Sequence, residues 1–309
     1  MLFLKSFILQ LRFFVLATSV LVWHFSSATA HANGYERVNL KGLNNDTRNL
    51  TSFDAMRTSM YKNKREMRRA WSAAVVYVPT ANGRTVKTHV RSIMRPGAAP
   101  IPGRYPLVVY LHGCDGLGIY SLQNIGHFVR QGYAVIAPAS FARKNYPISC
   151  DPKTNEGGMF NDTVKMRVAD AEYTLTQAKA LPWVDSSNVF LAGYSEGATT
   201  PAQVRTNSKT RVNARVIIAN TCTNRWPAQK YKNGVKAHKS EPVLALLGSR
   251  DPWFVNNKWA KGDCGASLSK TYGSKNVDYT SGAIANSHAL LDFRQARRTI
   301  FQFLAANRH

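Results

Sequence analysis

Residues 188–197 read NVFLAGYSEG, and this stretch decides the fold class of the chain. Its first half is a short apolar strand pattern, and its second half is a Gly-x-Ser-x-Gly turn that opens a stretch of helical character. A serine on such a strand-to-helix turn adopts a strained backbone conformation that only small flanking residues permit. Gly193 and Gly197 therefore let the hydroxyl of Ser195 stand clear of a sheet, where it can act as a nucleophile.

Two later segments carry an aspartate and then a histidine, which is the order that a catalytic serine–aspartate–histidine triad on such a turn requires. Residues 241–252 read EPVLALLGSRDP, an apolar strand that breaks at Gly248 and delivers Asp251 three residues later. His288 lies in a polar loop before an amphipathic segment. An imidazole activates a serine by taking its proton, and a buried carboxylate holds the imidazole in the required tautomer. The predicted triad is Ser195, His288 and Asp251; taken singly, Asp251 could cap a turn and His288 could start a helix.

An upstream segment predicts the oxyanion hole. Residues 106–116 read PLVVYLHGCDG, a buried strand that runs into a His-Gly turn. In this architecture such a turn contributes one backbone N–H, and the residue after the nucleophile contributes the other. The expected donors are the amides of Cys114, or a near neighbour, and of Glu196. We expect the ring of His112 to pack under the loop rather than to act as a second base.

The order of these motifs resembles that of the α/β-hydrolase superfamily, and most closely its dienelactone-hydrolase-type branch. The resemblance covers residues 71–309. Many dienelactone hydrolases carry cysteine at the nucleophile position of this turn, the nucleophile elbow, whereas this chain carries Ser195. The serine favours ordinary ester hydrolysis over a dienelactone substrate. A second departure is Pro201, which removes a helical hydrogen bond and bends or delays the helix after the nucleophile.

Alternating strand and helix patterns predict the α/β class, with a mostly parallel, doubly wound sheet and helices on both faces. Residues 73–78 and 86–94 form an expected antiparallel entry pair. The other expected elements are strands over residues 107–111, 134–138, 189–192, 215–219 and 243–247, and helices over residues 122–131, 164–180 and 290–306. In such a sheet the ligand binds at the carboxyl ends of the strands.

The first part of the chain reads as separate from this domain. Residues 1–32 contain a long apolar run with few charges and a small-residue ending, which is typical of a signal peptide cleaved after Ala30 or Ala32. A basic residue inside the apolar run makes an uncleaved membrane anchor the weaker alternative. Residues 33–70 form a basic extension, either a short surface helix or a flexible arm, and residues 71–309 form the catalytic domain.

Cysteine usage agrees with export. The chain has four cysteines without the C-x-x-C spacing of a zinc site or redox pair: Cys114, Cys150, Cys222 and Cys264. Each lies near an expected strand end or insertion on the catalytic side, so the pairs 114–150 and 222–264 would clip active-site loops together. The spacing leaves three connectivities open, and buried free thiols are the alternative. The expected localisation is secreted or periplasmic.

Aromatic residues and a long loop are candidates for the substrate pocket. The loop over residues 141–159 is long enough to form a lid or a pocket wall. Trp253 and Phe254 follow the predicted acid, and Trp226 follows the strand that carries Cys222. These three side chains are candidates for the acyl or alcohol side of the pocket, with plain packing as the alternative.

The formal net charge of +24 is the least expected feature for an esterase. It creates a positive field that could draw the protein to anionic polymers, to an acidic cell envelope or to acidic ester substrates. The basic residues are spread along the chain rather than gathered with aromatics into a nucleic-acid module, so no specific nucleic-acid partner is expected.

Together these features predict an exported serine hydrolase that cleaves carboxylic esters through an acyl-enzyme, with no metal or organic cofactor. A peptidase or amidase that uses the same triad is one alternative. The other is a non-catalytic, polyanion-binding protein on a hydrolase scaffold.

Overall fold

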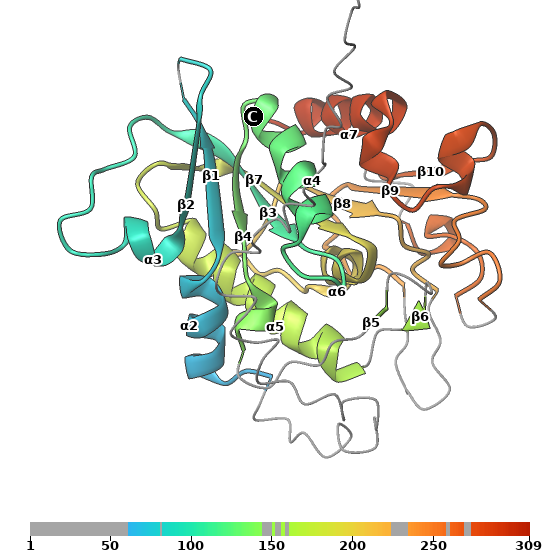
Figure 1. Ribbon diagram of the computed structural model, residues 1–309, viewed down its shortest axis with the longest axis horizontal. Helices are drawn as coiled ribbons and strands as arrows, with labels where there is room; N and C mark the ends of the chain where they lie inside the picture. The colour runs from blue at the N-terminus through green and yellow to red at the C-terminus, as the bar shows by residue number, and fades with distance from the viewer. Residues whose placement is uncertain are drawn as a thin grey trace, which may run out of the picture. The chain divides into compact units, whose positions relative to one another are not determined.

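Short runs of aliphatic residues form the central strands of one eight-stranded sheet (Figure 1). The computed structural model describes residues 61–80, 82–143, 150–151, 156–157, 161–223, 234–257, 260–268 and 273–309. The strands of the large sheet are β1 (Val75–Pro79), β2 (Thr85–His89), β3 (Tyr105–Leu111), β4 (Ala134–Ala137), β7 (Val184–Tyr194), β8 (Ala214–Ile218), β9 (Val243–Gly248) and β10 (Lys275–Tyr279). A separate antiparallel pair joins β5 (Cys150–Asp151) to β6 (Glu156–Gly157).

The strand order is β10-β9-β8-β7-β3-β4-β1-β2. Pairing is parallel from β10 to β4, and β1 is antiparallel to both β4 and β2. The chain leaves β3 towards β4 on one side and returns to β7 on the other side, so the order reverses at β3. Ligands of open α/β sheets bind in the crevice that such a reversal opens at the carboxyl ends of the strands. The segments after β3 and β7 lie at this position, and they are the two that the sequence singled out.

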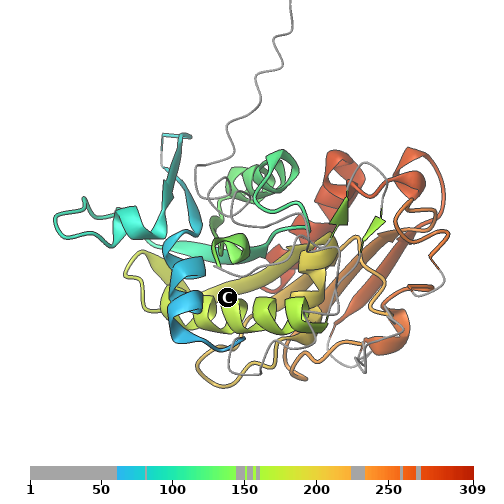
Figure 2. The same cartoon turned by 60° about the horizontal axis from the view of Figure 1, so that its bottom comes forward.

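Helices cover both faces of the sheet (Figures 1 and 2). Their bounds are α2 (Lys64–Ser72), α3 (Val90–Ile93), α4 (Ile119–Arg130), α5 (Asn161–Ala178), α6 (Thr199–Gln203) and α7 (Arg294–Ala306). The alternation of side chains along β3 sets the two layers: Val108 and Tyr110 pack with α4 and α7, whereas Leu107 and Val109 pack with α2 and α5. This arrangement confirms the predicted doubly wound α/β sheet.

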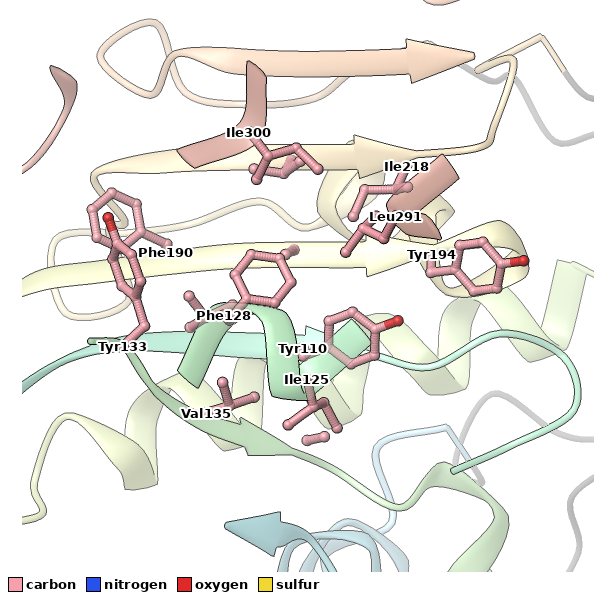
Figure 3. Packing of buried hydrophobic residues seen from close by; sticks show 14 of the residues in the cluster. Tyr110, Ile125, Phe128, Tyr133, Val135, Phe190, Tyr194, Ile218, Leu291 and Ile300 are labelled. Carbon is pink, nitrogen blue, oxygen red and sulfur yellow. The ribbon is translucent and has the colours of Figure 1, made fainter. Parts of the chain in front are cut away.

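The larger apolar core lies between the sheet and the pair α4 and α7 (Figure 3). Phe128 of α4 stacks edge-on against Phe301 of α7 with 5.5 Å between ring centroids, and Tyr133 meets Phe190 of β7 at 5.6 Å. Buried aromatic pairs of this geometry add about 0.5–1.5 kcal/mol beyond the burial of their area. These contacts hold β7, and hence the turn after it, against the helices.

The structure differs from the sequence prediction at several element ends. The second strand of the entry pair stops at His89, and Val90–Ile93 forms α3 instead. The last helix begins at Arg294 rather than at residue 290, after a 3-10 turn over Leu290–Asp292. Strand β10 was not predicted, because its half-exposed sequence KNVDY at the sheet edge lacks an apolar run.

Helix α2 crosses the expected boundary at residue 70. Its N-cap is Asn63, whose Oδ1 accepts a hydrogen bond from the backbone N–H of Arg65 at 2.9 Å. Ala70 and Trp71 at its other end are buried, and Trp71 belongs to the α5 side of the core. The basic run therefore ends in a helix that packs on the domain. The expected signal peptide lies outside the described residues, as does most of the basic extension.

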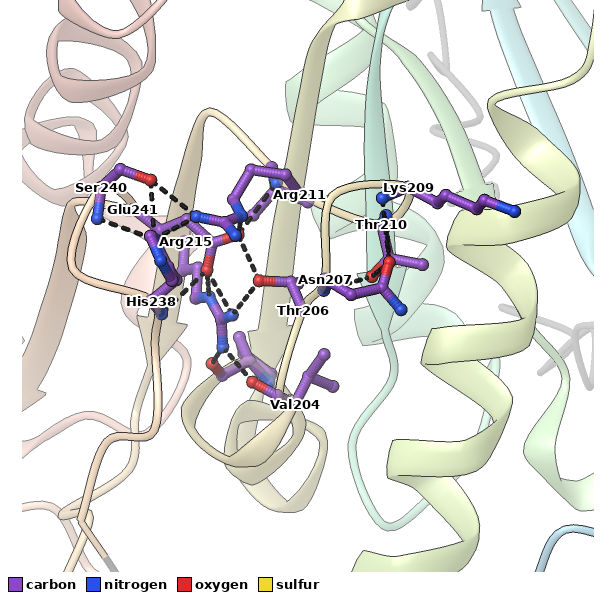
Figure 4. A network of polar contacts seen from close by, with 12 residues as sticks. Val204, Thr206, Asn207, Lys209, Thr210, Arg211, Arg215, His238, Ser240 and Glu241 are labelled. Carbon is purple, nitrogen blue, oxygen red and sulfur yellow. Dashed lines mark hydrogen bonds and ion pairs between the residues drawn. The ribbon is translucent and has the colours of Figure 1, made fainter.

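A buried ion pair holds the short helix α6 (Figure 4). Arg215 of β8 pairs with Glu241, and both side chains are completely buried. Nη1 of Arg215 also donates to the carbonyl oxygens of Pro201 and Val204 at 2.7 and 2.8 Å. Burial alone would raise the pKa of Glu241, but Arg215 and several hydrogen bonds bring it below its usual value. Because α6 begins at Thr199, four residues after Ser195, this network anchors the segment that follows the nucleophile turn.

Both disulfides favoured by the sequence are present. Cys114 pairs with Cys150, with 5.8 Å between their Cα atoms, and Cys222 pairs with Cys264 at 4.8 Å. They link the loops after β3 and β8 to more distant segments. Disulfides persist in oxidising compartments, so this pairing indicates that the protein matures in one. Within the described part of the chain, no helix is long and apolar enough to cross a membrane.

A carboxyl pair beside the second disulfide makes stability depend on pH. Burial and the neighbouring Asp263 raise the pKa of Asp278 from 3.8 to about 6. The folded protein therefore holds a proton that the unfolded chain releases near pH 4, and this contribution destabilises the fold progressively as pH rises from about 4 to about 6.

We expect Asp278→Asn to remove this loss. Relative to wild type, the free energy of unfolding of Asp278→Asn should be larger, and the variant therefore more stable, at pH 7 than at pH 4, as measured by urea denaturation at both values. An equal difference at the two pH values would contradict the proton-sharing pair.

Candidate active site

Ser195 lies immediately after β7, on a turn that has the geometry of a nucleophile elbow. Its φ angle is 56°, a left-handed conformation that is uncommon for a residue with a side chain. A Cβ atom on Gly193 would overlap the carbonyl oxygen of Gly197, and one on Gly197 would overlap the carbonyl oxygens of Leu111 and His112. Gly193 is therefore required by the tight closure of the turn on itself, and Gly197 by the close packing of the turn against the end of β3.

The chain after Ser195 shows the expected effect of Pro201. The first four residues, Ser195–Ala198, form a 3-10 turn, and regular α-helix runs only from Thr199 to Gln203. Asn220, at the end of β8, supports this turn, since its Nδ2 donates to the carbonyl oxygen of Ser195 at 3.1 Å. The strained turn is thus held from the neighbouring strand as well as by its own glycines.

The three residues of the predicted triad form one continuous hydrogen-bonded chain. Nε2 of His288 lies 2.8 Å from Oγ of Ser195, and Nδ1 of His288 lies 2.6 Å from Oδ2 of Asp251. Asp251 is 1% exposed, and its second oxygen accepts the backbone N–H of Trp253 at 2.9 Å. The Asp251 contact calls for the proton on Nδ1, which leaves Nε2 free to accept the serine proton.

Three aromatic rings surround His288. The ring centroids of Tyr194, Trp253 and Phe254 lie 5.2, 5.4 and 5.8 Å from that of His288. They restrict the orientation of the imidazole while leaving its ring nitrogens to Ser195 and Asp251. Of the aromatic pocket candidates, Trp253 lines the pocket described below, Phe254 contacts the histidine ring, and Trp226 lies outside the described residues.

Arg167 of α5 connects the two segments that are expected to form the oxyanion hole. Its Nη1 donates to the carbonyl oxygen of His112 at 2.8 Å, and its Nη2 donates to that of Gly113 at 3.1 Å. The same Nη2 lies 2.8 Å from a carboxylate oxygen of Glu196, and the Arg167 side chain is fully buried. One planar guanidinium therefore fixes the loop that carries Cys114 relative to the residue after Ser195.

His112 has the structural position that the sequence predicted. It is 1% exposed, its Nδ1 donates to the carbonyl oxygen of Gly113 at 2.7 Å, and its ring packs edge-on against Phe141 at 5.0 Å. Burial, with the nearby charge of Arg167, holds the pKa of His112 well below its usual value. A neutral, enclosed imidazole of this kind stabilises the loop.

The hydroxyl of Ser195 opens into a pocket of about 370 Å³, which we call the Ser195 pocket. Its walls include Cys114, Tyr120 and Trp253, and its charged groups are the carboxyls of Asp115 and Asp292. Desolvation in the pocket raises the pKa of Asp115, although Arg167 and His288 act in the opposite direction. No lysine or arginine of the described residues lines the Ser195 pocket, despite the strongly basic composition.

The described residues contain no group of three metal-ligating side chains.

Arg167 and Asn220 are the site residues that sequence reasoning missed. Neither lies in a motif, because each belongs to an element that folds back on the elbow from elsewhere in the chain. A basic residue on an amphipathic helix such as α5 normally reads as part of a solvated face. No pattern in the sequence distinguishes Arg167 from such a residue.

A parallel sheet with its nucleophile elbow at the strand-order reversal defines an α/β hydrolase. Residues 93–282 match the Dienelactone hydrolase family, which is more than half of the chain. The protein therefore belongs to the dienelactone hydrolase family. No curated protein sequence matches the chain.

Among solved structures, the chain is similar to an α/β-hydrolase enzyme from a Medee basin deep-sea metagenome library, with 11% identity over 76% of this chain and 98% of that chain and a TM-score of 0.47. It is also similar to a dienelactone-hydrolase-like promiscuous phosphotriesterase from metagenomic libraries (14% identity, 75% and 96% covered, TM-score 0.45). A third is a thermophilic esterase from Thermogutta terrifontis with butyrate bound (12% identity, 76% and 94% covered, TM-score 0.42).

Arg167→Lys should separate the positioning role of this side chain from its role in stability. Lysine keeps the charge but cannot hold both carbonyls and the carboxylate, so the two oxyanion donors lose their relative position. We expect kcat for an activated ester to fall on the order of a hundredfold, as for the loss of one oxyanion donor.

Arg143→Lys is the matched control for this prediction. Arg143 forms an equally buried ion pair, at 2.7 Å, with Asp170 of α5, the helix that also carries Arg167. No described hydrogen bond joins Arg143 to the loop after β3. Both variants should lower Tm, but Arg143→Lys should retain kcat. Equal losses of kcat in the two variants would show that Arg167 contributes stability alone.

Proposed function

We propose that this chain is an exported serine hydrolase that cleaves carboxylic esters through an acyl-enzyme on Ser195. The observation that carries the proposal is the hydrogen-bonded chain from Asp251 through His288 to a serine at a φ of 56°. A serine, a base and an orienting acid at these distances are the recognised geometry of nucleophilic acyl transfer. Membership of a hydrolase family supports the reaction class.

The reaction proceeds in two halves. Nε2 of His288 takes the proton of Ser195 as Oγ attacks the ester carbonyl, and Asp251 stabilises the imidazolium that forms. The amides of Cys114 and Glu196 hold the negative oxygen of the tetrahedral intermediate. His288 then returns the proton to the departing alcohol, and the acyl group stays on Oγ. In the second half, His288 activates a water molecule, which releases the acid and restores the serine.

The walls of the Ser195 pocket favour an uncharged group next to the scissile bond. Tyr120, Tyr194 and Trp253 offer apolar contact, and the carboxyls of Asp115 and Asp292 disfavour an anion at this position. The described residues that line this pocket add no lysine or arginine to offset those carboxyls. Amide cleavage by the same triad is the alternative reaction, and hydrolysis of matched ester and anilide substrates distinguishes the two.

A fluorophosphonate probe tests the proposal directly. Only an activated serine reacts with it, so we expect stoichiometric labelling of one residue, and peptide mass spectrometry should place the label on Ser195. Heat-denatured protein is the control, because unfolding separates His288 from the serine. A folded protein that does not react would support the polyanion-binding alternative on a hydrolase scaffold.

Export is supported by the two disulfides and by the signal-like residues 1–32. N-terminal sequencing of the protein recovered from its native host tests it. A mature chain that begins after Ala30 or Ala32 is the expected result, and an intact N-terminus would contradict it.

A further inference from the structure

A second hollow, of about 720 Å³, lies on the α4 side of the sheet. Figure 1 shows α4 between the β1–β2 pair and α7, and side chains from all of these elements line the hollow. Its charged and titratable residues are mostly basic: Lys87 of β2, His127 and Arg130 of α4, and Arg297 of α7. We call this hollow the basic groove.

Three cationic side chains of the basic groove, those of Lys87, Arg130 and Arg297, contact neighbouring groups that carry no negative charge. The Lys87 ammonium lies 5.4 Å from the centroid of the Tyr77 ring, and Nη2 of Arg130 lies 2.7 Å from Nδ1 of His127. Nη1 of Arg297 donates to the carbonyl oxygens of Leu291 and Asp292 at 2.6 and 2.8 Å. Across the described chain, none of the three forms an ion pair with a carboxylate.

His127 adds a neutral donor to the basic groove. Burial lowers the pKa of its imidazole to about 4, and the charges of Arg130 and Arg297 act in the same direction. The imidazole is neutral at pH 7, and its Nδ1 accepts from Arg130, so its Nε2 carries a proton that can be donated. Gln123 and Thr85 add uncharged donors to the same walls. An anion placed here would meet three cations together with N–H or O–H donors, against the single carboxyl of Asp292.

The basic groove adjoins the Ser195 pocket. Asp292 lines both, and the consecutive residues Ile119 and Tyr120 line one each. These two side chains are 56% and 51% exposed, which is unusual for large apolar residues and leaves an apolar ridge between the two hollows. A single extended molecule can therefore contact Ser195 at one end and the basic groove at the other.

We propose that the basic groove is a substrate subsite that binds an anionic group, such as a carboxylate or phosphate, of an ester whose scissile bond lies at Ser195. This inference rests on the proposed function. It assigns recognition of the ester bond to a pocket whose described lining contains no lysine or arginine, and recognition of the anion to Lys87, Arg130 and Arg297. Selectivity for anionic esters is then local to the basic groove rather than a result of the net charge.

Paired substrates test the subsite. The first series consists of 4-nitrophenyl monoesters of dicarboxylic acids of increasing length. Each is compared with the neutral compound in which the free carboxyl group is methylated and the 4-nitrophenyl ester is kept. A second series carries the carboxylate on the alcohol part of the ester instead of the acyl part. Once the substrate is long enough to cross the ridge of Ile119 and Tyr120, we expect the anionic ester to have a lower KM than the neutral ester of the same length in at least one series. Lys87→Gln combined with Arg130→Gln should raise that KM roughly five- to tenfold and leave kcat and the neutral ester unchanged.

Arg68→Gln combined with Lys275→Gln is the matched control. It removes the same number of positive charges from exposed residues far from the basic groove. Arg68 lies on α2, on the other face of the sheet, and Lys275 lies on β10, at the edge opposite to β2. If the control and the groove variant raise the KM equally, the long-range field steers the substrate and the subsite is overturned. An anionic ester that is not preferred at any length in either series also overturns it.

A binding measurement separates this inference from the proposed function. Titration calorimetry of Ser195→Ala with adipate and with inorganic phosphate needs no turnover, and binding should weaken roughly five- to tenfold in the Lys87→Gln, Arg130→Gln background. Free phosphate should inhibit the anionic ester competitively and spare the neutral ester. Equal inhibition of both would identify an effector site and overturn the subsite. Absence of binding together with fluorophosphonate labelling would overturn the subsite while the proposed function stands.

Discussion

Ser195→Ala is expected to lower kcat for a 4-nitrophenyl ester by about a million-fold, because removing the nucleophile of such a triad costs about as much as removing the whole triad. The fold should survive, since the change deletes one oxygen atom and the elbow is held by Gly193, Gly197 and Asn220. Initial rates measure the first statement, and the thermal unfolding curve measures the second.

Ser267→Ala is the control for this experiment, because Ser267 lies on a 3-10 turn away from the Ser195 pocket. It should retain wild-type kcat, and it shows that protein preparation and the assay do not account for the loss. Activity of Ser195→Ala within tenfold of wild type would refute the nucleophile assignment, as would fluorophosphonate labelling of the variant.

The second large effect is expected for Asp251→Asn, at roughly four orders of magnitude in kcat. The amide can turn its N–H₂ group towards Nδ1 of His288, which then becomes the acceptor. The proton moves to Nε2, the atom that faces Ser195 at 2.8 Å, so the imidazole can no longer take the serine proton. The backbone N–H of Trp253 can still bond to the remaining oxygen, so the loop should keep its position.

Asp263→Asn and Asp278→Asn are the matched controls for the acid. Both aspartates lie in the same C-terminal part of the chain, and neither bonds to His288 in the described structure. Each substitution should change kcat less than twofold at pH 7. A large loss for either of them, with Asp251→Asn active, would show that the orienting acid is misassigned.

The buried strands were predictable because strands that are covered on both faces consist almost entirely of apolar residues. Strands β3, β7 and β9 are covered on both faces, so they read as continuous apolar runs bounded by glycine or polar residues. Edge strand β10 is half exposed and has no such run, and it was missed. The start of α7 was placed four residues early, because Leu290 and Leu291 are buried in a 3-10 turn instead of a helix.

The elbow was also readable from the chain, and the structure brings the two other predicted triad residues into one hydrogen-bonded chain with Ser195. Gly193 and Gly197 are the residues that the packing of the turn requires, and the order of serine, aspartate and histidine follows the order of the strands. The two disulfide pairs were named among three possible connectivities. Local chemistry at strand ends carries this information, because each residue type there has few other reasons to occur in that spacing.

Only the tertiary structure decided how the site is held and where its charges lie. Arg167 reaches the elbow from α5, and Lys87, Arg130 and Arg297 come from three separate elements. A charged side chain on a helix or an edge strand looks the same in sequence whether it faces solvent, a carbonyl or a groove. The sequence determined the strands, the elbow and the order of the site residues, since these depend on neighbours along the chain. The Arg167 contacts and the basic groove depend on contacts between distant segments, which exist only after the sheet has formed.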